Sequence, residues 1–292
     1  MIHGSTPSVE VVISTFKPSS DPLLPTVAML VDQGVRPLII DDASPCTYDP
    51  VLRQASASGA RVVSKARNSG IASSLNIGLF HASSLGKDWL LTLDQDSLPA
   101  QGYLAVAVIE LASLAERAPQ IAALGAANVH GANAGLRYPT KEWRGITTTE
   151  EVVQSGTFWS VQTMSGLGGF NESLRIDAVD AEACLKLREN GYRIAITSKL
   201  SLAHEIGRTR TVRLLGRDVA VTQHNPQRRT SMLRNRMALF PREFAQSPRH
   251  GVRTLRRVLI NQSVGLLIEQ DRRQKALGTL RGLLPGNSRE KA

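Results

Sequence analysis

Short apolar runs alternate with helix-forming segments over the first 130 residues, and this alternation restricts the possible folds more than any other feature. The runs are rich in β-branched residues, which favour strands, and the segments between them repeat apolar residues at helical spacing. Strands so uniformly apolar need helices over both faces of their sheet. We therefore predict an α/β fold with a Rossmann-like, mostly parallel sheet. The expected strands are 9–14, 37–40, 61–65, 89–93, 121–129 and 154–160, and the expected helices are 23–33, 70–85, 101–117 and 179–189.

The composition is that of a folded protein in a reducing compartment. The chain has 292 residues, 42% hydrophobic and 21% charged, which excludes a disordered chain and suits one large domain with an appendage. Its two cysteines, Cys46 and Cys184, form neither a disulfide framework nor a zinc-type spacing. We see no signal peptide and no apolar run of the length that spans a membrane. A cytoplasmic location is therefore expected.

The positive charge is concentrated near the end of the chain. Residues 201–292 hold 19 Lys and Arg against 6 Asp and Glu, a net charge of +13, whereas the first 200 residues carry −3. The segment 245–285 alternates apolar residues with arginines at helical spacing, which predicts a basic amphipathic helix. It could lie on an anionic membrane or pack against protein. We expect a catalytic domain over 1–240 and a basic helical region over 241–292.

Two carboxylates follow the expected strand at 89–93 in the sequence "LTLDQDS". Asp94 and Asp96 repel each other unless a cation or hydrogen bonds compensate, so the stretch is either a polar turn or a metal site. Ligands of parallel sheets bind outside the carboxyl ends of the strands. The other strand ends also carry polar groups, and "RNSG" at 67–70 precedes a helix as an anion contact would. These strand-end residues are Thr15, Asp41, Asp42, Arg67, Asn68 and Gly70.

Two common phosphate-binding patterns are missing. No G-x-G-x-x-G follows the first strand and no P-loop sequence occurs. The phosphates of a nucleotide ligand would need another counter-charge, and a metal held by carboxylates is an ordinary source. His204, after an apolar strand-like segment, is a possible further ligand or a structural histidine.

The second half offers one candidate base and a basic cluster. Asp180 shares a helical stripe with the apolar Cys184 and Leu187, and the helix dipole favours its ionised form, as a general base requires. Glu182 lies on another face and could orient an acceptor, whereas Asp177 suits an N-cap. Arginine forks match phosphate oxygens, although a basic helix surface explains such a cluster equally well. The cluster comprises His224, Arg228, Arg229, Arg234 and Arg236.

An ordered set of motifs over residues 9–240 resembles the family 2 glycosyltransferases of GT-A fold, and most of all their bacterial rhamnosyltransferase branch. The "LDQDS" and "IDxVDxE" patterns are the more discriminating pieces. The QxxRW motif of processive synthases is absent, which implies one sugar added per encounter. The motifs are "VVISTFKP", "IIDDAS", "RNSGIASSLNIGL", "LTLDQDS", "QSGTFWS", "GGFNESLRIDAVDAEACLKLRENGY", "LAHEIG" and "HNPQRRTSMLRNR".

The resemblance implies roles for individual residues. Asp180 would be the catalytic base, in a pair that reads Val179-Asp180 where the family usually has Glu-Asp. Asp96, Asp94 and His204 would hold Mg²⁺ or Mn²⁺ on the donor diphosphate. The nucleotide sugar would contact Thr15, Asp41, Asp42, Arg67, Asn68, Gly70, Asp94, Gln95 and Arg234, and acceptor or phosphate groups would contact Glu182, Trp159, His224, Arg228 and Arg229.

The implied reaction is a single inverting displacement on a nucleotide-diphosphate sugar. The expected donor is dTDP-L-rhamnose, with a UDP-hexose or UDP-galactofuranose as the alternative, and the expected acceptor is a glycan or a lipid-linked sugar. A lipid-linked acceptor would place the protein at the inner face of a bacterial cytoplasmic membrane. A non-catalytic sugar-nucleotide binder or a nucleic-acid binder is a further alternative. Aromatic residues are only 4% of the chain, which disfavours binding to single-stranded nucleic acid.

Overall fold

The computed structural model describes residues 6–130, 135–136, 138–204, 209–214, 217–222 and 226–268. The chain divides into two compact units, described separately below. The first comprises Met1–Arg175 with Val179–Glu205, and the second Ile176–Ala178 with Ile206–Ala292. The boundary expected at residue 240 would fall inside a helix of the second unit, α7 (Pro226–Gln246). Within the described ranges, every helix is too short or too polar to cross a lipid bilayer.

A mixed sheet forms the centre of the first unit, with strand order β3-β2-β1-β4-β10-β6-β11-β9-β8. Each apolar run of the sequence analysis forms one of its strands, because β-branched and apolar side chains suit a sheet buried on both faces. Its strands are β1 (Val9–Thr15), β2 (Leu38–Asp41), β3 (Arg61–Ser64), β4 (Trp89–Asp94), β6 (Ile121–His130), β8 (Thr140–Trp143), β9 (Ile146–Thr149), β10 (Thr157–Ser160) and β11 (Arg193–His204), with β5 (Ser97–Pro99) on β11 and β7 (Gly135–Leu136) on β6.

The sheet is parallel through its first half and mixed in its second half. Strands β1 to β4 run in one direction, and β6 and β11 are parallel to each other. Strand β10 lies between β4 and β6 and is antiparallel to both. Strand β9 is antiparallel to both of its neighbours, β11 and β8. The expected α/β sheet is therefore confirmed, but as a whole it is mixed, with β9 and β10 running opposite to β1–β4. Because β10 runs the opposite way, the residues just before it lie at the carboxyl end of β4.

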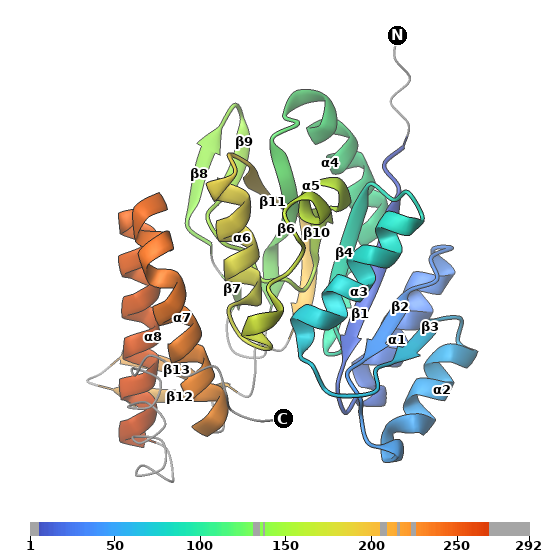
Figure 1. The fold of residues 1–292 in the computed structure, drawn as a ribbon, viewed down its shortest axis with the longest axis horizontal. Helices are drawn as coiled ribbons and strands as arrows, with labels where there is room; N and C mark the ends of the chain where they lie inside the picture. Colours follow the sequence, from blue (N-terminus) through green and yellow to red (C-terminus); the bar gives the residue numbers. More distant parts are fainter. Residues whose placement is uncertain are drawn as a thin grey trace. The chain divides into compact units, whose positions relative to one another are not determined.

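Helices cover both faces of the sheet (Figure 1). On one face, α1, α2 and α4 bury Leu30, Ala55 and Leu111 in one apolar core cluster. On the other, α3, α5 and α6 bury Leu75, Met164 and Leu187 in a second cluster. The helices are α1 (Ser20–Asp32), α2 (Asp49–Ala57), α3 (Ile71–Ser84), α4 (Tyr103–Arg117), α5 (Val161–Gly166) and α6 (Val179–Glu189), with 3₁₀ turns η1 (Cys46–Tyr48) and η2 (Glu172–Leu174).

The second unit contains two long helices joined by buried polar contacts. Arg229 of α7 donates from Nη1 to the Gln262 Oε1 of α8 (Pro248–Ile268) at 3.4 Å, and Gln262 Nε2 donates to the Arg229 carbonyl at 3.0 Å. Helix α8 occupies the first part of the amphipathic segment expected over 245–285, and residues 269–285 lie outside the described ranges. A hairpin of β12 (Thr209–Leu214) and β13 (Arg217–Thr222) belongs to the same unit.

Candidate active site

The polar strand ends meet at one edge of the sheet, as the sequence predicts. Thr15 of β1 lies opposite Asp41 of β2, and Ser14 of β1 lies opposite Asp94 of β4. Parallel neighbours end together, so these side chains gather at the carboxyl edge, where α/β sheets bind ligands. The chain then turns from β4 into β5, which pairs with the end of β11.

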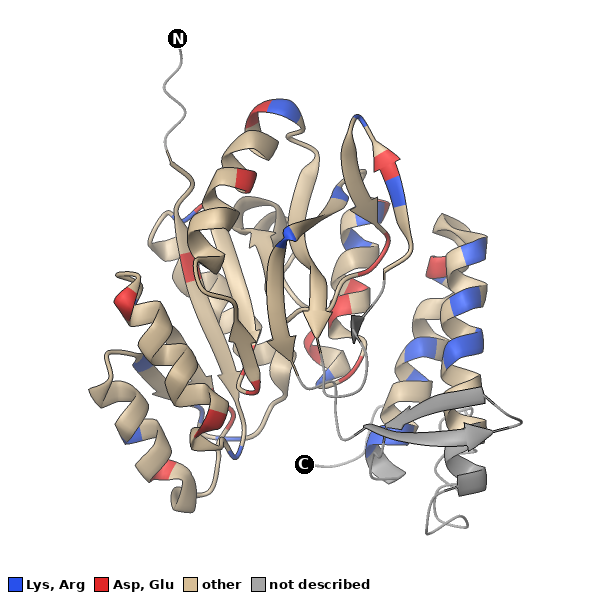
Figure 2. Ribbon diagram, turned by 180° about the vertical axis from the view of Figure 1, so that it is seen from behind, with Lys and Arg blue, Asp and Glu red and all other residues tan. Residues whose placement is uncertain are grey.

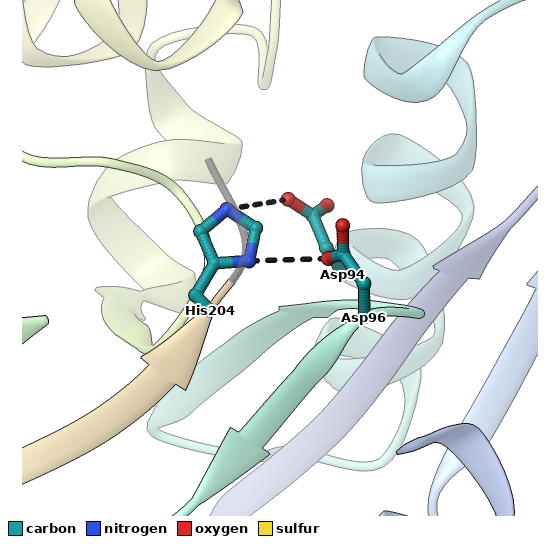
Figure 3. A group of neighbouring side chains, drawn as sticks. All are labelled: Asp94, Asp96 and His204. Carbon is teal, nitrogen blue, oxygen red and sulfur yellow. Dashed lines mark ion pairs between the residues drawn. The ribbon is translucent and has the colours of Figure 1, made fainter. Parts of the chain in front are cut away.

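Asp94, Asp96 and His204 face one another at this edge (Figure 3). His204 Nδ1 lies 3.1 Å from Asp96 Oδ1, and His204 Nε2 lies 3.7 Å from Asp94 Oδ2. The pairing of β5 with β11 sets His204 directly opposite Ser97, one residue beyond Asp96. The Asp96 side chain is 45% exposed and that of His204 only 11%, so the cluster opens to solvent on the aspartate side.

Polar residues that the sequence analysis did not select hold the cluster in place. Gln154 Nε2 and Ser14 Oγ both donate to Asp94 Oδ1. Ser155 Oγ accepts the backbone N–H of Asp94 at 2.9 Å and lies 2.6 Å from Ser97 Oγ. Ser97 Oγ in turn lies 2.8 Å from His204 Nδ1. Gln154 and Ser155 reach the site because β10 is reversed, and the sequence "QSGTFWS" carries no sign of that direction.

The cluster perturbs the titration of its own members. Partial burial raises the pKa of Asp94 to about 6, although the charge of His204 opposes the shift. Burial lowers the pKa of His204, but its hydrogen bond with Asp96 and the charges of Asp94, Asp96 and Asp180 together raise it above the ordinary value. Without a cation, the imidazole therefore tends to be protonated and to neutralise part of the carboxylate charge.

The chemistry of these donors suits a divalent cation. One ligand atom from each of Asp94, Asp96 and His204 lies within 4.8 Å of the others. Carboxylate oxygens are the usual ligands of Mg²⁺, and a carboxylate set with one imidazole also suits Mn²⁺. The three residues predicted as metal ligands from sequence thus lie together, and the donor set fits the expected ion.

Asp41 and Asp42 shape loops instead of presenting free carboxylates. Asp41, 1% exposed, accepts hydrogen bonds from Thr15 Oγ1 at 3.1 Å and Ser44 Oγ at 2.6 Å. Asp42 accepts the backbone N–H groups of Ser69 at 2.8 Å and Gly70 at 2.9 Å, and pairs with Lys65 Nζ at 2.6 Å. Thr15, Asp41 and Asp42 were expected to contact the donor. Their side chains bind one another or the neighbouring loops, and contact with the donor stays a prediction.

The "RNSG" loop exposes two polar side chains, but that of Asn68 donates to the Asp42 carbonyl at 3.2 Å and accepts from Arg175 Nη2 at 3.4 Å. Arg67 and Asn68 are exposed, whereas Gly70 is buried with φ +92°. A Cβ at residue 70 would lie 2.4 Å from the Arg175 carbonyl oxygen, so glycine is required for this close approach. Gln95, also expected at the donor site, accepts the Phe16 backbone N–H at 2.8 Å and holds the loop after β1.

Asp180 lies in the first turn of α6 and is half-buried. Its Oδ1 accepts the Ala181 backbone N–H at 2.8 Å, as a carboxylate at a helix start does. Its charge contributes to the raised pKa of His204, which places the candidate base within electrostatic range of the metal cluster. Cys184 and Leu187, on the same stripe, are fully buried.

Three residues expected to contact acceptor or phosphate are structural. Trp159 is fully buried and donates from Nε1 to Thr92 Oγ1 at 3.0 Å, so it belongs to the core. Glu182 is 2% exposed and pairs with Lys186 at 3.4 Å. Arg229, 4% exposed, joins α7 to α8. A motif match does not tell which way a side chain faces, and all three face inward.

The remaining basic residues belong to the second unit. Arg228 donates from Nε and Nη2 to Asp177 Oδ1, at 3.2 Å each. Asp177 is not an N-cap, because α6 begins at Val179 and Asp177 lies two residues before it. Arg234 is half-buried in α7, and His224 lies outside the described residues.

The chain is similar to known proteins in sequence and in fold. The protein is 24% identical over 240 residues to the dTDP-rhamnosyl transferase RfbF of Shigella flexneri, which covers 80% of this chain and 79% of that one. Among solved structures, S. aureus TarS 1-349 matches with a TM-score of 0.58 at 16% identity, over 94% of this chain and 79% of that chain. GalNAc-T7 with UDP, GalNAc and Mn²⁺ matches with a TM-score of 0.57 at 14% identity, over 79% of this chain and 48% of that chain.

These structural likenesses show the fold, an α/β architecture of the GT-A type with a central sheet flanked by helices. The family itself is shown by the sequence. The model of glycosyl transferase family 2 matches residues 10–167, which include the carboxyl ends of β1, β2 and β4 and the aspartates Asp94 and Asp96. Since that match covers more than half of the chain, the protein belongs to glycosyl transferase family 2.

Proposed function

We propose that this glycosyltransferase moves one L-rhamnose from dTDP-L-rhamnose to an acceptor hydroxyl, with metal dependence and inversion at the anomeric carbon. The observation that carries the proposal is the Asp94–Asp96–His204 cluster, with the Asp180 carboxylate in electrostatic range of it. The similarity to a dTDP-rhamnosyl transferase supports rhamnose as the sugar.

The reaction follows from the charges at the site. A divalent cation held by Asp94, Asp96 and His204 supplies positive charge to the diphosphate leaving group. The exposed Arg67 adds a guanidinium that matches phosphate oxygens. Asp180 takes the proton of the acceptor hydroxyl as its oxygen attacks the anomeric carbon, and the bond to the diphosphate breaks. One displacement needs one base, whereas a retaining double displacement needs a second carboxylate as nucleophile.

A second donor class is the main alternative. TarS also matches as a complex with UDP-GlcNAc, and GalNAc-T7 was solved with UDP and GalNAc. Neither likeness exceeds 16% identity, so both leave the base and sugar of this protein's donor open. A non-catalytic binder remains the alternative of another class, and salt-dependent DNA or RNA binding that ignores sugar nucleotides would favour it.

We further propose that α8 rests on an anionic membrane surface, which suits a cytoplasmic enzyme with a lipid-linked acceptor. Its exposed residues mix arginine with apolar side chains, and no Asp or Glu occurs between Pro248 and Ile268. Figure 2 shows basic residues along both helices of this unit. Apolar insertion together with arginine–lipid attraction is the usual basis of such binding. The exposed arginines and larger apolar residues are Arg249, Val252, Arg253, Arg256, Arg257, Leu259 and Ile260.

Donor preference is the first prediction. We expect calorimetric titration to show Mn²⁺-dependent binding of dTDP-L-rhamnose that is at least about tenfold tighter than binding of UDP-glucose or UDP-galactofuranose. EDTA should abolish the difference, because the diphosphate then loses its counter-charge. A preference for a UDP-sugar would change the donor and keep the mechanism. No metal-dependent binding of any donor would refute the metal site.

The two aspartate roles predict different kinetic effects. Asp180→Asn should keep donor affinity within about twofold and lower turnover at least about 100-fold, because it removes only the base. Asp96→Ala should weaken Mn²⁺-dependent donor binding instead. Turnover is measured as nucleoside diphosphate released from the preferred donor with water as the acceptor. Asp88→Asn, at an exposed carboxylate that binds Ser8, is the matched control. Near-normal turnover of Asp180→Asn would refute the assignment of the base.

Metal affinity should rise with pH. Asp94 must be ionised and His204 neutral to bind a cation, and both have raised pKa values, that of Asp94 being about 6. Protonation of Asp94 opposes binding at pH values below about 6. Protonation of His204, whose pKa is raised above its ordinary value, opposes binding at higher pH values as well. We expect the Mn²⁺ dissociation constant, measured by calorimetry, to weaken at least about tenfold from pH 8 to pH 5. Asp94→Asn should bind more weakly with a shallower pH dependence, and a flat profile for the unmodified protein would contradict the assignment.

Membrane binding should depend on charge and apolar contact together. We expect the protein to sediment with phosphatidylglycerol-containing vesicles, less so at high salt, and not with phosphatidylcholine alone. Arg256→Gln with Arg257→Gln, and separately Leu259→Asp, should each reduce binding several-fold. Arg53→Gln with Arg144→Gln removes equal charge from exposed positions of the first unit and should have little effect. Failure of the unmodified protein to bind anionic vesicles would assign this helix face to protein contacts.

A further inference from the structure

We infer that Asn235 and Arg228 of α7 are positioning residues for catalysis, because they hold the three-residue segment that leads into the catalytic base. This inference rests on the proposed role of Asp180. The segment is Ile176–Ala178, which belongs to the second unit although Arg175 before it and Val179 after it belong to the first. The chain continues from Ala178 directly into α6, and Asp180 is the second residue of that helix.

The backbone of this segment has a conformation that L-residues rarely adopt. Asp177 has φ +64° and Ala178 has φ +61°, two consecutive non-glycine residues in the left-handed region. Such conformations persist only where surrounding contacts impose them, and they cluster at functional sites. Their dihedral angles decide the direction in which the first turn of α6 leaves the segment, and hence where Asp180 lies.

The contacts that impose this conformation come from α7. Asn235, 9% exposed, donates both hydrogens of Nδ2, one to the Ile176 carbonyl at 3.0 Å and one to the Asp177 carbonyl at 2.9 Å. Arg228 donates from two nitrogens to the Asp177 carboxylate, whose side chain is 12% exposed. One amide thus satisfies two consecutive carbonyls of the strained turn, while a guanidinium holds its side chain.

The residue before the segment is held by the "RNSG" loop. The Arg175 carbonyl accepts the Ile71 backbone N–H at 2.8 Å, and Arg175 Nη2 donates to the Asn68 carbonyl at 3.1 Å. Gly70 allows this approach, since a side chain there would clash with Arg175. The candidate donor loop therefore holds Arg175, the residue that leads into the segment.

Loss of the α7 contacts should move Asp180 while leaving the fold intact. Ala183, Cys184 and Leu187, which follow Asp180 in α6, are fully buried. These residues keep α6 in the core, so relaxation of the segment is confined to the approach and the first turn. Misplacement of a catalytic group by about 1 Å can cost on the order of 100-fold in rate.

The test compares Asn235→Ala with a matched control. Gln262→Ala also removes a buried amide of the second unit that donates to a backbone carbonyl, in that case the carbonyl of Arg229. For Asn235→Ala we expect kcat for nucleoside diphosphate release to fall about 10- to 100-fold, with the donor dissociation constant within about twofold. Gln262→Ala should leave kcat within about twofold. Hydrogen exchange at Asp177–Ala181 should quicken in Asn235→Ala and not in the control.

A double-mutant cycle separates positioning from other effects. If Asn235 acts through the base, Asn235→Ala added to Asp180→Asn lowers the residual turnover no further, whereas independent effects multiply. Arg228→Lys, at an exposed position, gives the second test: it keeps the charge, loses the fork and should lower kcat several-fold. Unchanged kcat in both Asn235→Ala and Arg228→Lys would overturn the inference. Normal turnover in Asp180→Asn alone would instead refute the proposed base.

Discussion

Two carboxylates at the end of a buried strand must be compensated, and much of the site is built around that requirement. Asp94 and Asp96 follow β4, and the groups that offset their charge come from three other strands or their ends: Ser14 from β1, Gln154 before β10 and His204 from β11. Each of these strands has to end or begin at the same edge of the sheet. The strand order β1-β4-β10-β6-β11, with β10 reversed, satisfies that condition.

The strands, the helices of the first unit and the metal cluster follow largely from the sequence. Uniform apolar runs predict buried strands, and polar residues at their ends predict a common edge. The grouping of His204 with Asp94 and Asp96 came from the resemblance to the family. The direction of β10 could not be predicted, because an apolar run reads the same for parallel and antiparallel pairing. Gln154 and Ser155 were missed for that reason alone.

Residue type also failed to predict which way some side chains face. The resemblance implied contacts of Trp159 and Arg229 with the acceptor or with phosphate, yet both are buried and hydrogen-bonded within the protein. Asp42 shows the opposite case. Asp42 was selected because it lies at a strand end. Its carboxylate pairs with Lys65 and accepts hydrogen bonds from two backbone N–H groups of the "RNSG" loop. It acts by shaping the loop that exposes Arg67 and Asn68.

The Val179-Asp180 pair has a physical explanation in the packing of α6. Where the family usually has a glutamate, Val179 is 3% exposed and belongs to the apolar cluster under α3, α5 and α6. A carboxylate buried there would need a partner to avoid a large desolvation cost. Valine removes that cost and anchors the first turn in the core, directly after a segment with two left-handed residues. Because a single displacement requires one base, the half-buried Asp180 can serve alone, and the neighbouring position is free to stabilise the turn that carries it.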